Sequence, residues 1–241
     1  MNELLLHSIS IDWGKIPPGS YLRQIPALRG LERLGFTRPV TFFAGENGSG
    51  KSTLLEAIAV AYGFNPEGGT KNYAFSTHDS HSGLWQALGL AKGYRQAKWG
   101  YFLRAESFYN VATQEEAYAD LLHPSRGWHL RSHGESFLDA LQGCLRPGGL
   151  YIFDEPEAAL SPQNQLTLLL EVHTWAGRGA QFLIATHSPI LLGLPGAEIL
   201  AFGQGPVHPC AYEDTGSFQV TEMFLNHRQQ LLGHLLGEGR W

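Results

Sequence analysis

The stretch Gly45–Thr53, GENGSGKST, limits what this chain can fold into more than any other feature. It fits the pattern G-x-x-x-x-G-K-[ST], in which glycines let the backbone turn sharply and present its N–H groups to phosphate oxygens. Residues 40–44 before it are an apolar run typical of a buried strand, and residues 52–59 after it have the composition and apolar spacing of a helix. The partial positive charge at the start of such a helix favours an anion. We therefore predict a P-loop that binds a nucleoside triphosphate, rather than a chance glycine-rich turn.

The P-loop motif gives its residues separate tasks. The Lys51 ammonium is expected to reach the β- and γ-phosphates, and the Ser52 hydroxyl is expected to contact Mg²⁺. The other positions that we expect to contact the nucleotide are Asn47, Gly48, Ser49, Gly50 and Thr53. The stretch thus predicts both the triphosphate and its metal ion.

A second signal is the pair of adjacent carboxylates Asp154 and Glu155, which follows the apolar run 150–153. The predicted strand delivers both side chains at its C-terminal end, where α/β sheets bind their ligands. In this Walker B arrangement, Asp154 holds Mg²⁺ through its water shell, and Glu155 orients and deprotonates the attacking water. The alternative is an Asp-Glu turn without function. A P-loop in the same chain favours the catalytic interpretation.

Two weaker patterns each leave a structural alternative open. His187 follows the apolar run 181–186 and is placed to touch a γ-phosphate, but a histidine there is by itself more often structural. Ser132 and Gly134 belong to the pentad SHGES, which precedes the amphipathic helix start at 137–141. A helix N-terminus binds anions, and a plain serine N-cap explains the same pattern.

The composition suits a single globular domain. The chain has 241 residues, of which 43% are hydrophobic and 16% charged, so it can bury a substantial core. Its formal net charge of -5 gives no basic footprint for nucleic acid over the whole domain, although a local patch stays open. Cys144 and Cys210 lie far apart and predict no disulfide framework. Residues 1–11 lack the features of a signal peptide and no run is long enough for a membrane span, so we expect a cytoplasmic protein.

Some smaller features also have two interpretations. Tyr21 precedes the P-loop by a distance that suits stacking on an adenine, although most tyrosines simply pack. His78 and His81 are spaced i, i+3 with no further ligands nearby, which favours loop or helix-cap chemistry over a zinc site. Residues 27–34 are expected to form a short helix before the P-loop strand.

Taken together, the motifs resemble those of the ABC-type ATPases. The order is P-loop, Ser-x-Gly pentad, Asp-Glu strand, Ala159-Leu160-Ser161-Pro162 and Thr186-His187-Ser188-Pro189, and it covers roughly residues 42–189. The resemblance implies an α/β P-loop NTPase fold with three layers and with ATP and Mg²⁺ as cofactors. It also implies one ATPase domain over residues 1–241, with a helical signature lobe at about 70–145 inserted between the P-loop and Walker B parts.

In that family two nucleotide-binding domains dimerise head to tail around two ATP molecules. The resemblance implies that Ser132 and Gly134 contact the γ-phosphate held by the partner's P-loop. His187 matches the switch histidine, which positions the γ-phosphate and the water. Ser161, with Ala159 and Leu160, matches the D-loop that crosses the dimer interface.

Departures from the transporter pattern indicate a branch of the family. The pentad Ser132–Ser136 replaces Leu-Ser-Gly-Gly-Gln, and Glu157 stands where transporters usually have Thr or Asn. The amino-acid sequence around the P-loop is similar to that of the soluble SMC/RecF-like heads and of small bacterial AAA-type ATPases. No glutamine stands at the end of the strand 101–105, which leaves Glu106 or Ser107 as the Q-loop residue.

The first functional hypothesis is an ATP-driven homodimerisation switch that hydrolyses ATP, in DNA maintenance or phage defence. The alternative is the ATP-binding subunit of an ABC transporter, with which a permease would co-purify. Nucleic acid and an unidentified protein both stay open as partners. A group of arginines is a candidate phosphate-binding face or an ordinary solvated surface: Arg23, Arg29, Arg33 and Arg38.

Overall fold

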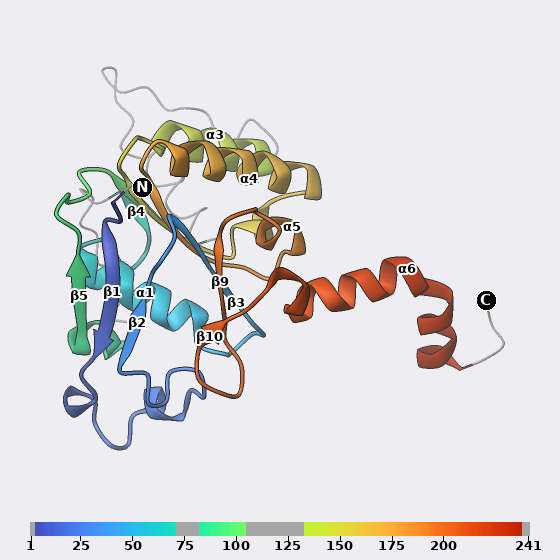
Figure 1. Ribbon diagram of the computed structural model, residues 1–241, viewed down its shortest axis with the longest axis horizontal. Helices are drawn as coiled ribbons and strands as arrows, with labels where there is room; N and C mark the ends of the chain where they lie inside the picture. The colour runs from blue at the N-terminus through green and yellow to red at the C-terminus, as the bar shows by residue number, and fades with distance from the viewer. Residues whose placement is uncertain (1–2, 71–81, 105–132, 238–241) are drawn as a thin grey trace.

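The fold is built around a mixed sheet of seven strands (Figure 1), in a computed structural model that describes residues 3–70, 82–104 and 133–237. Five neighbouring strands run parallel, and a short antiparallel strand closes each edge. In spatial order the strands are β10 (His208–Pro209), β9 (Glu198–Ala201), β3 (Val40–Ala44), β8 (Gln181–Ala185), β7 (Leu150–Asp154), β6 (Gly100–Arg104) and β4 (Gly69–Thr70).

The central strands β3, β7 and β8 are buried along their whole length. Such continuous burial is typical of parallel strands, because both faces of the sheet are covered. Side chains alternate between the two faces, so that Phe43 packs into one core cluster and its neighbour Phe42 into the other. The two clusters fill the spaces on either side of the sheet.

One face of this sheet is covered by helix α1 (Lys51–Tyr62) and then by a small antiparallel sheet (Figure 1). Its strands, in the order β2-β1-β5, are β2 (Arg33–Gly35), β1 (Leu6–Ile11) and β5 (Leu88–Lys92), and the 3-10 turn η3 (Gly83–Ala87) precedes β5. The buried side chain of Gln181 joins the two sheets: its Oε1 accepts the N–H groups of Leu5 and Leu6 at 2.9 and 2.8 Å.

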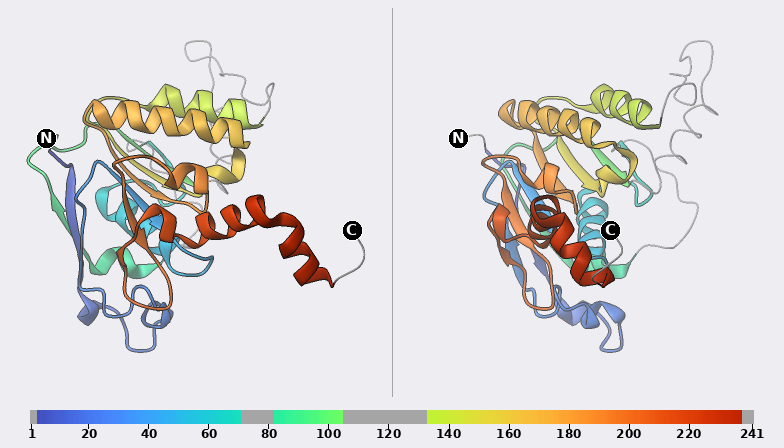
Figure 2. Two further views of the ribbon diagram at one scale, coloured as in Figure 1. Left: turned by 45° about the vertical axis from the view of Figure 1, so that its right-hand side comes forward. Right: turned by 90° about the vertical axis from the view of Figure 1, so that its right-hand side faces the viewer.

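The other face is covered by helices. These are α3 (His133–Cys144), α4 (Pro162–Gly177) and the short α5 (Pro189–Leu192), and Figure 2 shows α3 and α4 lying along the same side of the sheet. Leu168 and Val172 of α4 pack against the sheet with Leu191 and Leu192 of α5. The result is a three-layer α/β fold, as the sequence predicted.

The last helix, α6 (Gly216–Leu236), projects away from these layers in Figure 1 and in the left view of Figure 2. None of its residues is buried, and its backbone is kinked at His227. It is joined to the body through the 3-10 turn η7 (Tyr212–Asp214), where the rings of Tyr212 and Phe218 pack with centroids 4.6 Å apart. Within the described part of the chain, no helix is long and apolar enough to cross a membrane.

One predicted element is wrong. Residues 27–34 do not form a helix: Leu28 and Arg29 donate to the carbonyl of Ile25 in a turn, and Gly30 then adopts a φ of 75°, so the chain leaves helical geometry and continues into β2. The sequence also gave no indication of β5. Much of the predicted lobe at 70–145 lies outside the described residues.

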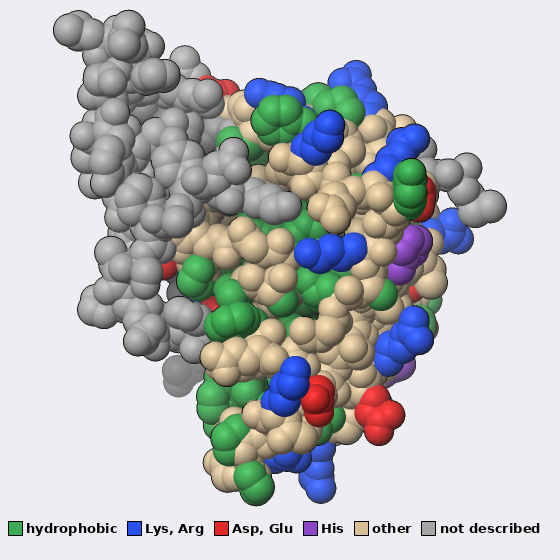
Figure 3. Space-filling model, turned by 90° about the vertical axis from the view of Figure 1, so that its left-hand side faces the viewer, with side chains coloured by type: hydrophobic (Ala, Val, Ile, Leu, Met, Phe, Trp, Pro, Cys, Tyr) green, Lys and Arg blue, Asp and Glu red, His purple; other side chains and the backbone are tan. Residues whose placement is uncertain are grey.

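One of the arginines named as a candidate phosphate-binding face, Arg23, has a structural role. The guanidinium of Arg23 donates to the carbonyls of Trp13, Ile16 and Pro17, so it ties down the loop around the 3-10 turns η1 (Trp13–Lys15) and η2 (Tyr21–Gln24). Figure 3, which views the side on which β5 and β1 lie, shows Lys and Arg side chains spread among apolar and polar groups.

Candidate functional site

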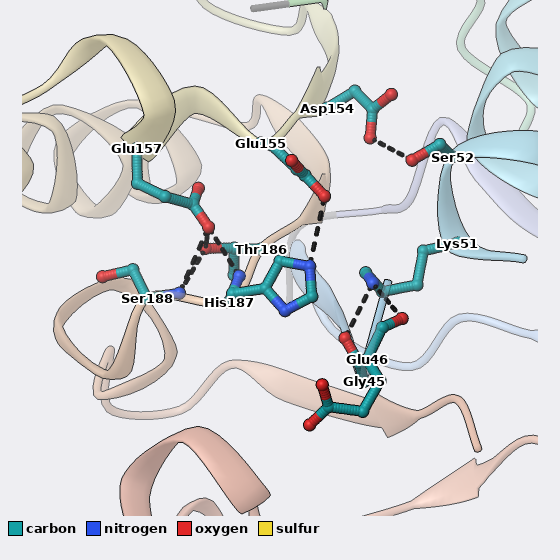
Figure 4. A network of polar contacts seen from close by, with 10 residues as sticks. All are labelled: Gly45, Glu46, Lys51, Ser52, Asp154, Glu155, Glu157, Thr186, His187 and Ser188. Atoms are coloured by element: carbon teal, nitrogen blue, oxygen red, sulfur yellow. Dashed lines mark hydrogen bonds and ion pairs between the residues drawn. The ribbon is translucent and has the colours of Figure 1, made fainter. Parts of the chain in front are cut away.

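The carboxyl ends of β3, β7 and β8 meet at one edge of the sheet, because β8 runs parallel between the other two. The P-loop follows β3, Asp154 ends β7 with Glu155 directly after it, and His187 lies in the loop after β8. Figure 4 shows that these side chains, far apart in the sequence, face one another in one place. Ligands of open α/β sheets bind at this edge.

Glycine is required at two points of the P-loop. A Cβ on Gly45 would lie 1.9 Å from the carbonyl oxygen of Phe202, and one on Gly50 would lie 2.6 Å from Cγ2 of Ile25. Gly50, with a φ of 101°, is the N-cap of α1, and no side chain caps that helix. The first N–H groups of α1 therefore point toward the loop, in the arrangement that binds phosphate.

Lys51 is held in place by the loop itself. Its Nζ donates to the carbonyls of Gly45 and Glu46 at 2.7 and 2.9 Å, and the residue is 3% exposed. Burial lowers the pKa of Lys51, whereas the nearby carboxylates of Glu155, Asp154, Glu157 and Glu46 act in the opposite direction. The ammonium is thus positioned inside the loop at the start of α1.

Ser52 and Asp154 form the second contact of the site. The Ser52 hydroxyl donates to Oδ1 of Asp154 at 2.8 Å. Burial raises the pKa of Asp154 to about 6, although the hydrogen bond from Ser52 and the charge of Arg104 favour the carboxylate. Both side chains offer oxygen ligands, and a buried carboxylate with a raised pKa is stabilised by a nearby cation. These residues therefore fit Mg²⁺.

Arg104 was missed by the sequence analysis. It ends β6 in register with Asp154 and forms an ion pair with Glu56 of α1 at 2.7 Å. Both partners are mostly buried, so the pair joins the strand end to the P-loop helix. The sequence offered no signal for it, since the two residues are 48 positions apart.

Glu155 has an unusual backbone. Its φ of 50° and ψ of 52° are left-handed, and among the described residues no other non-glycine has a positive φ. Its Oε1 lies 3.1 Å from Nε2 of His187 (Figure 4), and both side chains remain about one-third exposed, at 38% and 33%. The carboxylate and the imidazole are therefore accessible to a water molecule.

Comparisons with known proteins agree with this geometry. Residues 20–118 match a family model described as an AAA domain, and residues 136–193 match one described as an AAA domain, putative AbiEii toxin, Type IV TA system. The ADP conformation of MJ1267, an ATP-binding cassette of an ABC transporter, covers 99% of this chain and 100% of its own, with a TM-score of 0.51 at 18% identity. This chain has the fold of an ABC-type ATPase. The predicted resemblance to that family is confirmed.

Two further proteins are similar to this chain. The hemin import ATP-binding protein HmuV of Pseudomonas aeruginosa is 29% identical over 165 residues, which cover 59% of this chain and 64% of HmuV. The SMC head domain from Thermotoga maritima matches 86% of this chain and 100% of its own at 14% identity, with a TM-score of 0.49. The matched part thus spans less than two thirds of HmuV.

Some of the remaining predicted residues lie in the P-loop or at the start of a helix, and others lie outside the described part of the chain. The P-loop positions Asn47, Gly48, Ser49 and Thr53 lie between β3 and the first turn of α1. Ser161 is the N-cap of α4, where its hydroxyl accepts the N–H of Asn164 at 3.3 Å. Gly134 lies in the first turn of α3. Five residues lie outside the described ranges: His78, His81, Glu106, Ser107 and Ser132.

Tyr21 lies in a segment that approaches the P-loop. The side chains of Ile25 and Leu28, just after η2, are the neighbours that a Cβ on Gly50 would meet. Tyr21 itself is 56% exposed. Its ring is therefore not needed for packing, and stacking on an adenine stays a prediction.

Proposed function

We propose that this chain is a Mg²⁺-dependent ATPase, in which residues 1–241 work as one domain. The observation that carries the proposal is the contact between Glu155 and His187 at 3.1 Å, beside the P-loop and the Ser52–Asp154 pair. A triphosphate bound by the loop has its terminal phosphate at the side where these two partly exposed side chains lie.

The residues have separate roles in this proposal. The P-loop N–H groups and Lys51 bind the phosphates, and charge on the phosphates is stabilised by Mg²⁺ bound at Ser52 and Asp154. Glu155 accepts the proton of the attacking water. His187 orients the water and the terminal phosphate through its ring, which faces Glu155.

We also propose that ATP drives two copies together. The described residues of the site come from the P-loop, from the end of β7 and the residue after it, and from the loop after β8. In this proposal Ser132 and Gly134 of a second copy supply further donors, and Ser161, the N-cap of α4, belongs to the segment that crosses the interface. ATP that binds the dimer better than the monomer shifts the equilibrium toward the dimer, and hydrolysis reverses the shift.

A second candidate function is the ATP-binding subunit of an ABC transporter. The similarity to HmuV, which is named as a hemin import ATP-binding protein, favours it. The pentad Ser132–Ser136 and Glu157 favour the first proposal, in which the switch serves DNA maintenance or phage defence through a nucleic-acid or protein partner. Co-purification with a permease in detergent distinguishes the two.

The test of hydrolysis is phosphate release by the purified chain with Mg-ATP. Glu155→Gln is expected to lower kcat by roughly 100-fold or more while ATP still binds, because the amide cannot accept a proton. Lys51→Ala is expected to lose ATP binding. Glu171→Gln, on α4 away from the site, is the matched control and keeps the wild-type rate. Hydrolysis by Glu155→Gln at the wild-type rate would show that the base is another residue.

A further inference from the structure

We propose that Glu157 is a positioning residue, whose carboxylate anchors the loop after β8 and thereby holds His187 against Glu155. The proposal rests on the proposed ATPase function. The sequence indicates only that Glu157 departs from the transporter pattern. The structure shows which groups its carboxylate contacts.

A single oxygen of Glu157 collects three donors from the loop (Figure 4). Its Oε1 accepts the hydroxyl of Thr186 at 2.7 Å and the backbone N–H groups of His187 and Ser188 at 2.5 and 3.2 Å. The Thr186 hydroxyl also accepts the N–H of Ser188 at 3.0 Å. The loop that carries the His187 ring is therefore hydrogen-bonded at three consecutive residues to one carboxylate oxygen.

This contact joins the ends of two strands. Glu157 lies in the 3-10 turn η6 (Pro156–Ala159), directly after β7, and Thr186 directly follows β8. A second connection runs in parallel: the Ser188 hydroxyl donates to Oε1 of Gln165 at 2.5 Å, and Nε2 of Gln165 donates to the carbonyl of Leu160 at 3.1 Å. The loop with the histidine and the turn with the predicted base are thus held as one unit.

The anchor acts on the backbone because the ring has little other support. The His187 side chain is 33% exposed, whereas Thr186 and Ser188 on either side are 0% and 5% exposed. The rotamers open to a side chain depend on the φ and ψ of its backbone. The three hydrogen bonds hold the backbone at His187, and we infer that they thereby favour the rotamer that makes the 3.1 Å contact with Glu155.

The carboxylate of Glu157 suits the proposed positioning role. Hydrogen bonds to an ionised acceptor are roughly twice as strong as neutral ones. The second oxygen, Oε2, is buried and has no hydrogen-bond partner within the described residues, which is unfavourable for stability.

The test compares three variants with one control. Glu157→Ala removes the acceptor, and it is expected to lower kcat by roughly 10- to 100-fold while KM for ATP changes less than about threefold, because ATP binding uses the P-loop. Glu157→Gln keeps an acceptor oxygen and is expected to restore kcat to within about fivefold of wild type. In a His187→Ala background, Glu157→Ala is expected to cause no further loss.

Glu198 provides the matched control. Its carboxylate also accepts hydrogen bonds from the backbone N–H of Thr37 and from the hydroxyls of Thr37 and Thr41. Glu198 is the first residue of β9, so it lies at the amino ends of the parallel strands, whereas the site lies at their carboxyl ends. Glu198→Ala therefore removes a similar set of hydrogen bonds and is expected to leave kcat unchanged. Equal losses in both variants, or additive losses with His187→Ala, would overturn the proposal.

A measurement without turnover separates this proposal from the proposed ATPase. In histidine-labelled protein, the NMR signals of the His187 ring, assigned with His187→Ala, are expected to shift in Glu157→Ala and not in Glu198→Ala. If the wild type proves inactive, the ATPase proposal fails while this spectrum still tests the positioning role. An unchanged His187 signal in Glu157→Ala would contradict it.

Discussion

At the scale of single residues, Asp154 has the most strongly perturbed carboxylate among those in the site. The residue is 9% exposed, and burial raises the pKa of its carboxyl from 3.8 to about 6. The folded chain therefore binds this proton more tightly than the unfolded chain does. A cation at Ser52 and Asp154 competes with the proton, so the same burial couples metal binding to pH.

This shift predicts a pH-dependent stability. Without Mg²⁺, the contribution of Asp154 is fully present below pH 3.8 and is lost as the pH rises through about 6. The loss amounts to about 3 kcal/mol at most, because one pKa unit corresponds to about 1.4 kcal/mol. Urea unfolding in EDTA at pH 4.5 and 7 measures it, with Asp154→Asn as the reference. A difference between wild type and variant that does not change with pH would contradict the assignment.

Residues with local signatures were predictable, and those with long-range roles were not. Lys51, Ser52 and Asp154 belong to motifs that fix the nearby backbone, so the sequence indicated their place at the site. Glu157 and Arg104 act through partners 29 and 48 positions away, to which no local pattern points. Their contacts arise only when β6, β7 and β8 pair in the sheet.

At the scale of elements, the P-loop and the segment after η2 support each other. Gly50 begins α1 with a φ of 101°, and a Cβ there would meet Cγ2 of Ile25 at 2.6 Å. Next to this contact the chain turns at residues 25–29 and leaves helical geometry at Gly30, so the predicted helix at 27–34 does not form. The elements β3, α1 and β7 were predictable from their apolar patterns, and the alternation in residues 4–11 indicated β1, whereas β2 and β5 were not predicted.

Substitution of two glycines tests this contact. Gly50→Ala is expected to lower the free energy of unfolding by about 2–4 kcal/mol, through both the left-handed backbone and the clash with Ile25. Gly48 has a φ of 77° but nothing within 4 Å of its would-be Cβ, so Gly48→Ala is expected to cost only about 1 kcal/mol. Equal costs, measured by urea unfolding, would show that Ile25 moves aside.

At the scale of the whole molecule, the site lies at an open edge. Glu155 and His187 are each about one-third exposed, and ATP chemistry is favoured when charge is stabilised from several sides. A second copy, placed head to tail, would add the donors of its Ser132–Ser136 pentad to these partly exposed side chains, as the proposed ATP-driven dimer requires.

The most direct test is the molar mass in solution of Glu155→Gln, with and without Mg-ATP, with bound nucleotide measured on the same sample. We predict a monomer without ATP and a doubled mass with it, because the variant is expected to bind ATP without hydrolysing it. Glu155→Gln combined with Lys51→Ala is the control and is expected to stay monomeric. A monomer that demonstrably holds ATP would contradict the dimerisation switch and favour a subunit that needs a different partner.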